Sequence, residues 1–314
     1  MRPFICIFML LQVSGCDILD TSPEASTFSH AHRKPPIQTE QQFRKLLSKD
    51  DKAIADITRW LEEYQEKIKT DISLQRNFIQ LTQARLLDVR QAYEDFLALN
   101  PNHNKARAAF ASFLTYIRDE QGAIDQWHNA LKSDSANATL WNNLATHLGT
   151  LSIESGNDKL ISNILDNFNK SVNFAPNEPL YHNNYATALS LYSIKAADHY
   201  QTSQASILKE ASEHFHKAHS LAPKDFNYAA DYAESFLDIR PLQYDIAIEA
   251  WNKARQLAKK NLQIQWVELQ IAILEIEDGK INTAKTRLAK VTDQSFSGLK
   301  KRLLETITNS NKQK

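Results

Sequence analysis

The chain has 314 residues with 37 basic and 37 acidic side chains, and therefore no formal net charge. Six glycines make up about 2% of it, against a usual share near 7%, which is too few for a turn-rich β-sandwich or barrel. No two glycines are close enough to form the G-x-G-x-x-G or G-x-x-x-x-G-K motifs that bind dinucleotides and phosphates. A balanced charge also disfavours a nucleic-acid partner, which usually needs a basic protein face. We therefore expect no cofactor of these classes and no nucleic-acid ligand.

The first residues have the pattern of an export signal. One positive charge precedes a short apolar stretch, residues 4–11, that is too short to span a membrane as a helix. The segment Val13-Ser14-Gly15-Cys16 follows and resembles the lipobox of bacterial lipoproteins. The resemblance implies that residues 1–15 are a signal peptide, that Cys16 carries the lipid, and that the chain is exported and anchored to the cell envelope on the periplasmic face. Asp17 resembles the residue that keeps lipoproteins at the inner membrane in enteric-type envelopes.

Two alternatives remain for this start: an ordinary secretory signal, or a buried N-terminal helix with a cysteine there by accident. If the lipobox holds, Cys6 leaves with the signal and the mature chain has no second cysteine, so it forms no internal disulfide. Residues 16–41 are rich in Ser, Thr, Pro and His without helical or strand periodicity, which predicts a lipidated, flexible tether. We interpret His30 and His32 within it as polar filler rather than as metal ligands.

Helical periodicity begins after residue 41. Apolar side chains at intervals of three and four from Ile54 to Ile68 predict a surface helix, which Ser48 and Asp51 begin as a capping box. Residues 42–101 are interpreted as N-terminal helices with a degenerate repeat. No stretch alternates long enough for a strand, so the prediction is an all-α chain.

The strongest signal is an internal repeat in which alanine, an aromatic residue and a second alanine recur at fixed spacing. The three copies are Ala123-Trp127-Ala130, Ala211-Phe215-Ala218 and Ala247-Trp251-Ala254, and Ile164-Phe168-Ser171 is a near match. An upstream helix repeats as well, with Trp141, Leu144, Ala145 and Leu148 recurring as His182, Tyr185, Ala186 and Leu189. These residues resemble the tetratricopeptide repeat (TPR), a pair of helices in about 34 residues.

The resemblance implies a right-handed α-solenoid of helix hairpins over residues 102–294, with insertions near 150–158 and 190–206 and a capping helix at 295–314. Small residues are needed where the two helices of a hairpin cross. We expect Ala145, Ala186, Ala233 and Ala272 to be those residues on the first helices, opposite Ile164, Ala211, Ala247 and Ala284 on the second. The alternative is a generic helical array or bundle.

Partner contacts are also implied by the resemblance. In family members that bind extended peptides, an asparagine just before the motif leucine bonds the ligand backbone. Asn143 and Asn184 match that position, and Asp231 and Gln270 occupy it in the last two repeats. Asn142, Asn183 and His147 extend the polar strip. The prediction is that another protein or an extended peptide binds here; the alternative is that these side chains are solvated or bonded within their own hairpins.

The sequence offers little for catalysis. No cysteine follows Cys16, and neither H-E-x-x-H nor G-x-S-x-G occurs, so we expect no catalytic residue, no metal and no small-molecule cofactor. The histidines at 214, 216 and 219 are interpreted as a solvated outer face, and Glu275 with Glu277 as solubilising charge. The hypothesis is a membrane-anchored, non-catalytic adaptor or scaffold. The alternative is an enzyme or ligand-binding protein with its site in the inserted segments around Tyr192, His199 and Tyr200.

Overall fold

The computed structural model of the protein describes residues 37–310, which form fourteen α-helices joined by turns and short 3-10 segments. No strand occurs in these residues, so the all-α prediction is confirmed. The predicted signal peptide, Cys16 and His30 and His32 lie outside the described residues. The first described helix begins at Ile37, so residues 37–41, which were predicted to be tether, are helical.

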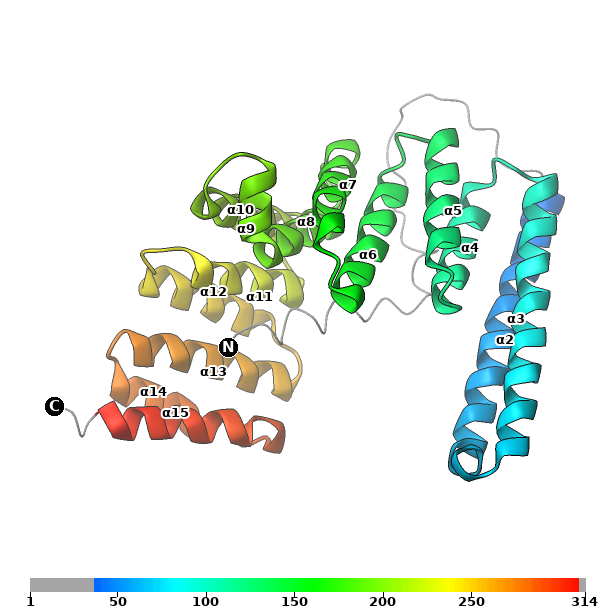
Figure 1. Ribbon diagram of the computed structural model, residues 1–314. Coiled ribbons are helices and arrows are strands. Elements are labelled where there is room, and N and C mark those ends of the chain that lie inside the picture. The colour runs from blue at the N-terminus through cyan, green and yellow to red at the C-terminus, as the bar shows by residue number, and fades with distance from the viewer. Residues whose placement is uncertain (1–36, 311–314) are drawn as a thin grey trace. The chain divides into compact units, whose positions relative to one another are not determined.

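The described part of the chain divides into two compact units, residues 37–150 and 151–310, which are described separately. The first unit contains two long helices followed by shorter ones (Figure 1). They are α2 (Ile37–Thr70), α3 (Ile72–Leu99), α4 (Asn104–Tyr116), α5 (Glu120–Ser133) and most of α6 (Ala138–Ser155).

The helices α2 and α3 form an antiparallel hairpin that runs on past the ends of α4 and α5 (Figure 1). Asp71 caps α3 by accepting the backbone N–H groups of Ser73 and Leu74. The helix start predicted at Ser48 is wrong, because α2 is continuous through that point. Its buried face already includes Phe43 and Leu46, so the apolar side of the helix begins before the predicted cap.

The second unit contains the remaining helices, paired mainly with their neighbours in sequence. They are α7 (Ile161–Phe174), α8 (Pro179–Leu191), α9 (Ser193–His199), α10 (Gln204–Leu221), α11 (Phe226–Ser235), α12 (Tyr244–Leu257), α13 (Asn261–Glu277), α14 (Ile281–Ala289) and α15 (Ser297–Ser310). The hairpins of the repeat are α8 with α10, α11 with α12, and α13 with α14. The short helix α9 lies within the predicted insertion at 190–206.

The crossing residues predicted from the repeat are buried. Ala233 and Ala247 belong to one apolar cluster that also contains Trp251, and Ala272 and Ala284 belong to the next. All eight crossing positions are less than 2% exposed: Ala145, Ala186, Ala233, Ala272, Ile164, Ala211, Ala247 and Ala284. The small side chains let the two helices of a hairpin approach closely, and the aromatic residue of each triple fills the space beside the crossing.

Among residues 37–310, no helix is both long enough and apolar enough to cross a membrane.

Candidate functional site

The predicted contact residues lie on the first helices of the repeats. Asn142, Asn143 and His147 are on α6 in the first unit; Asn183 and Asn184 on α8, Asp231 on α11 and Gln270 on α13 are in the second. The two sets belong to different units, so each is considered within its own unit.

Asn183 and Asp231 bring the first helices of two successive repeats together. The Asn183 amide hydrogen-bonds the Asp231 carboxylate, and both residues are half-buried. The pKa of Asp231 is raised to about 6, mainly by burial and in smaller part by the charge of Asp225, against the lowering effect of the Asn183 hydrogen bond. The carboxylate takes the amide nitrogen as its donor, and the Asn183 Oδ1 is buried without a hydrogen-bond partner. The pair therefore leaves one unfilled acceptor.

The surroundings of this pair are acidic. Tyr228 lies three residues before Asp231 on α11, and its phenol is half-buried. Burial, with smaller contributions from the carboxylates of Asp225, Glu178 and Asp231, raises the pKa of Tyr228 to about 12. Three carboxylates therefore lie near the Tyr228 phenol at this end of α8 and α11. Their negative charge favours a ligand that carries hydrogen-bond donors and positive charge.

Asn143 also has a buried polar group without a hydrogen bond. Its Oδ1 accepts from the Asn142 amide at 3.3 Å, while its own Nδ2 is buried without a hydrogen-bond partner. Asn143 therefore keeps a donor, as Asn183 keeps an acceptor. Asn184, at the equivalent position in the next repeat, is half-buried and is already engaged in an interaction within the protein.

Asn142, His147 and Gln270 do not lie at the surface as predicted. Asn142 is 5% exposed and Gln270 is 7% exposed. His147 is buried with its Nδ1 3.1 Å from the Thr115 hydroxyl oxygen and its Nε2 3.5 Å from a Glu120 carboxylate oxygen. These side chains pack inside the repeats, because neighbouring helices cover their side of the first helix.

A buried network of charges in the last repeats was missed by the sequence prediction. Glu268 on α13 is 2% exposed and accepts from Arg255 at 2.6 Å and from Arg287 at 2.9 Å. Arg287 also donates to Glu275 at 2.8 Å, so the interpretation of Glu275 as solubilising charge is wrong. The signal that could have found the network is the run Val267 to Glu275, where two glutamates stand among apolar residues.

The histidines of α10 form packed contacts instead of the predicted solvated face. His214 lies with its Nδ1 2.7 Å from the Nδ1 of His182 on α8, and the His182 Nε2 donates to the carbonyl of Pro176 at 3.0 Å. Burial, with a smaller contribution from His182, lowers the pKa of His214 to about 4. The ring of His219 packs against Tyr232 of α11, and burial lowers its pKa as well. His216 is exposed as predicted, and its ring also contacts Tyr232, with ring centroids 5.0 Å apart.

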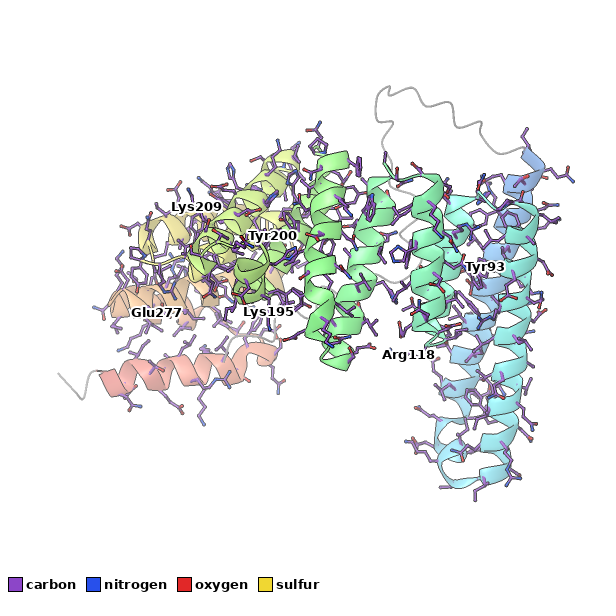
Figure 2. The ribbon with its side chains drawn as sticks, turned by 45° about the horizontal axis from the view of Figure 1, so that its top comes forward. Tyr93, Arg118, Lys195, Tyr200, Lys209 and Glu277 are labelled. Carbon is purple, nitrogen blue, oxygen red and sulfur yellow. The ribbon has the colours of Figure 1, made fainter. Side chains whose placement is uncertain are left out.

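The inserted segment brings polar side chains together, but they bond to one another. The His199 Nε2 lies 2.8 Å from an oxygen of Asp166, and the Tyr185 hydroxyl donates to Tyr200 at 3.3 Å and to Glu210 at 3.4 Å. Figure 2 shows Tyr200 among the packed helices of the second unit. These bonds hold α9 against α7, α8 and α10.

Two hollows on the described surface lie elsewhere. One is a shallow depression of about 540 Å³ along α15, and the other, of about 120 Å³, lies between α2 and α3. In the described residues, no group of three or more His, Cys, Asp or Glu is placed to hold a metal ion.

Comparison with known proteins identifies solved structures that share the fold of this chain. No protein-family model and no curated protein sequence matches the chain. The solved structure of YrrB, described as a TPR protein with an unusual peptide-binding site, matches 69% of this chain and 99% of its own, with a TM-score of 0.52 and 14% identity. The structure of PilF from Pseudomonas aeruginosa matches 82% of this chain and 98% of its own, with a TM-score of 0.51 and 17% identity. The chain has the TPR fold. At these identities the likeness extends to the fold alone, and the repeat pattern read from the alanine and aromatic positions agrees with it.

Proposed function

We propose that this TPR chain is a non-catalytic adaptor that binds an extended segment of another protein along its first helices. The observation that supports this most directly is the unfilled acceptor of Asn183 beside the half-buried carboxylate of Asp231. A buried polar group without a partner costs free energy, which a ligand recovers by supplying the missing hydrogen bond once the amide side chain turns to expose that atom. In the first unit, the Asn143 Nδ2 is a buried donor without a hydrogen bond, and a ligand that supplies an acceptor would satisfy it.

A peptide backbone has the right chemistry for both residues. Each peptide unit offers one N–H donor and one C=O acceptor, so an extended segment bound to the second unit can donate to Asn183. A segment bound to the first unit can accept from Asn143 in the same way. The carboxylates of Asp225, Glu178 and Asp231 add a preference for a basic side chain near Asn183. Asp231 is mostly ionised at neutral pH, because its pKa of about 6 lies below 7.

The function class also has support from the fold neighbours. YrrB is described as having a peptide-binding site on a TPR fold, and we extend that class of ligand, a peptide, to this chain. The packed and mutually bonded groups around Tyr200 give no comparable support to an enzyme.

The anchor is the second part of the proposal. The lipobox Val13-Ser14-Gly15-Cys16 supports lipid attachment at Cys16 and location in a bacterial cell envelope on the periplasmic face. Asp17 favours the inner membrane if an enteric-type sorting rule applies.

The peptide site is tested with an array of unstructured ten-residue peptides that vary in charge, probed with the fluorescently labelled full chain. Basic peptides should bind best, and Asn183→Ala should weaken the best of them about fivefold, the worth of roughly 1 kcal/mol for one hydrogen bond. Asn143→Ala combined with Asn184→Ala tests the positions implied by the family resemblance. Asn173→Ala, an exposed asparagine of α7, is the matched control and should bind like the natural chain. Equal binding by Asn183→Ala and the natural chain would remove Asn183 from the site.

The anchor is tested by Cys16→Ala. The variant should move from the membrane to the soluble fraction and lose labelling by radioactive fatty acid. A variant that still pellets with membranes after a carbonate wash places the anchor elsewhere.

A further inference from the structure

The hydrogen bond between Asn183 and Asp231 uses only one end of the Asn183 amide. The Nδ2 group donates to the Asp231 carboxylate, which joins α8 to α11, the first helices of two successive repeats (Figure 1). The other end of the amide, Oδ1, is buried without a hydrogen-bond partner. An ionised carboxylate has acceptor oxygens only, so Asp231 does not fill this acceptor in its charged form.

A proton on Asp231 changes this balance. A carboxylic acid has one O–H donor and one C=O acceptor, and a side-chain amide has the complementary pair of groups. The C=O of the acid keeps the bond from the Asn183 Nδ2, and the O–H finds an unfilled acceptor on the same amide, Oδ1. Protonation therefore adds a hydrogen bond within the pair and removes a half-buried charge, and both effects favour the protonated form in the free protein.

The acidic groups near the pair act in the same direction. Burial, and in smaller part the charge of Asp225, raises the pKa of Asp231 to about 6. Asp225 is fixed close by, because its carboxylate caps α11 by accepting the Asn227 N–H at 2.7 Å. Glu178, just before α8, acts together with Asp231 on the Tyr228 phenol, so a further carboxylate lies on this side of α11.

The titratable groups on the other sides of α11 lie toward Tyr232, the residue after Asp231. α10 and α12 are the helices that pack most closely on α11. One step along a helix turns the side chain by about 100°, so Tyr232 and Asp231 face different neighbours. The groups around Tyr232 are His216 and His219 of α10, whose rings contact it, and Lys253 of α12, whose charge acts on its phenol. Asp231 thus lies on the acidic side of α11.

We propose that a proton closes the peptide site of the second unit: protonated Asp231 donates to the Asn183 Oδ1 and occupies the acceptor that a bound peptide would use. This inference rests on the proposed function, because it assigns a regulator to that same acceptor. With both ends bonded to Asp231, the Asn183 amide no longer turns outward to meet a backbone N–H. Peptide and proton therefore exclude each other, and peptide binding weakens as the pH falls through the titration of Asp231.

The test is the affinity of the full chain for the best basic peptide of the array, made with blocked ends, a rhodamine label and no Asp, Glu or His. Fluorescence anisotropy gives the dissociation constant at pH 7.5 and at pH 5.0. It should rise about tenfold in the natural chain, because the ionised fraction of Asp231 falls by about that ratio for a pKa of about 6. Far-UV circular dichroism at pH 5.0 checks that the chain stays folded.

Two substitutions separate the new hydrogen bond from the lost charge. Asp231→Asn and Asp231→Ala both remove the charge, but only the asparagine has an N–H that can donate to the Asn183 Oδ1. Asp231→Asn should therefore bind the peptide about fivefold more weakly than Asp231→Ala, the worth of one hydrogen bond, and both variants should have flat pH profiles. Asp225→Asn is the matched control, because it removes a neighbouring charge but no partner of Asn183, and it should keep a profile that falls with pH.

The free chain gives a readout that needs no peptide. In NMR spectra of the natural chain, the side-chain amide signals of Asn183, assigned with Asn183→Ala, should shift with pH at the same midpoint as the carboxyl carbon of Asp231. The Asn183 signals should remain constant over this range in Asp231→Asn. An Asn183 amide that does not respond while Asp231 titrates overturns the proposal.

The binding results distinguish this inference from the proposed function. A natural chain that binds the peptide equally at pH 7.5 and 5.0 overturns the inference and leaves the proposed function in place. Equal affinities of Asp231→Asn and Asp231→Ala also overturn it, because loss of charge alone would then explain the pH profile. A chain that binds no peptide at pH 7.5 overturns the proposed function, and the regulation of its site with it.

Discussion

The buried charge network around Glu268 supports a prediction whose size can be worked out from the structure. We consider Glu268→Gln, which keeps the shape of the side chain and removes its charge. Glu268 is almost fully buried and is shared by two arginines, Arg255 and Arg287. Removing one partner of a buried ion pair costs about 3–5 kcal/mol, because the other charge stays desolvated. We expect the lower end, about 3 kcal/mol, since Arg255 is partly open to solvent and Arg287 keeps Glu275.

The assay is thermal unfolding followed by circular dichroism. For a unit of this size, about 3 kcal/mol lowers Tm by roughly 6–12 °C. Repeat arrays lose structure locally, so hydrogen exchange should accelerate in α12 to α14 and remain unchanged in α2 to α5. Glu277→Gln, an exposed change on the same helix, is the control and should stay within about 0.5 kcal/mol of the natural chain.

The pH dependence tests the electrostatic cause separately. Burial raises the pKa of Glu268, but Arg287 and Arg255 outweigh it and hold the pKa below the ordinary value of 4.5. A carboxyl with a lowered folded pKa stabilises the protein above its unfolded pKa, and that stability disappears as the pH falls. The gap between Glu268→Gln and the natural chain should therefore close in acid. A Tm within 1 °C of the natural value at pH 7, or a gap that persists at pH 3, would refute the reasoning.

Single buried groups support three further predictions. Asp50→Asn should stabilise the chain by about 1–2 kcal/mol at pH 7.5, allowing for screening, because the pKa of Asp50 is raised to about 6 in the folded chain, mainly by burial, which makes its charged form unfavourable. This gain, measured by urea titration, should decrease as the pH falls below 6. A destabilised variant would contradict the prediction. Between pH 7 and 5, the free energy of unfolding of the natural chain should fall by about 1 kcal/mol relative to that of His214→Asn. The lowered pKa of His214 makes the folded state bind fewer protons than the unfolded state below pH 6.5. Parallel pH profiles of the two chains would contradict this. Ala233→Leu should destabilise the chain by about 1–3 kcal/mol in thermal unfolding, because the larger side chain overpacks the helix crossing. Ala55→Leu, on the exposed side of α2, is the control and should have no effect. Equal effects of the two changes would contradict the role of Ala233 at the crossing.

The repeat could be predicted from sequence because steric demand at a crossing restricts residue type strongly. Ala233 and Ala247 meet in one cluster beside Trp251, as the spacing indicated. A larger residue at such a point separates the helices, so the small residue marks the crossing without any knowledge of its neighbours. The same reasoning failed at Ser48, because a residue that often begins a helix can also lie within one when the apolar face extends on both sides of it.

Polar partners were much less predictable. The bonds from His182 to His214 and from Asn183 to Asp231 join residues 32 and 48 positions apart in the sequence, respectively. Which side chains meet depends on the rotation of each hairpin against the next, and a shift of one residue turns a helix by about 100°. Sequence spacing places a side chain on a helix face, but it does not say which polar group stands opposite.

Asp231 and Gln270 occupy equivalent positions in two repeats but have different surroundings. Both occupy the place just before the motif residue of a first helix, yet Asp231 is half-buried and takes a bond from the preceding first helix, while Gln270 is 7% exposed. The difference comes from the elements that pack onto the two helices. Ile307 of α15 joins Leu269 and Ala272 of α13 in one apolar cluster, so the end of the array packs onto α13, whereas α11 has its main contacts with α10 and α12. The position that we propose to contact a peptide at Asp231 is thus part of the packed interior at Gln270. The proposed peptide site of the second unit is therefore assigned to Asn183 and Asp231 and not to the last repeat.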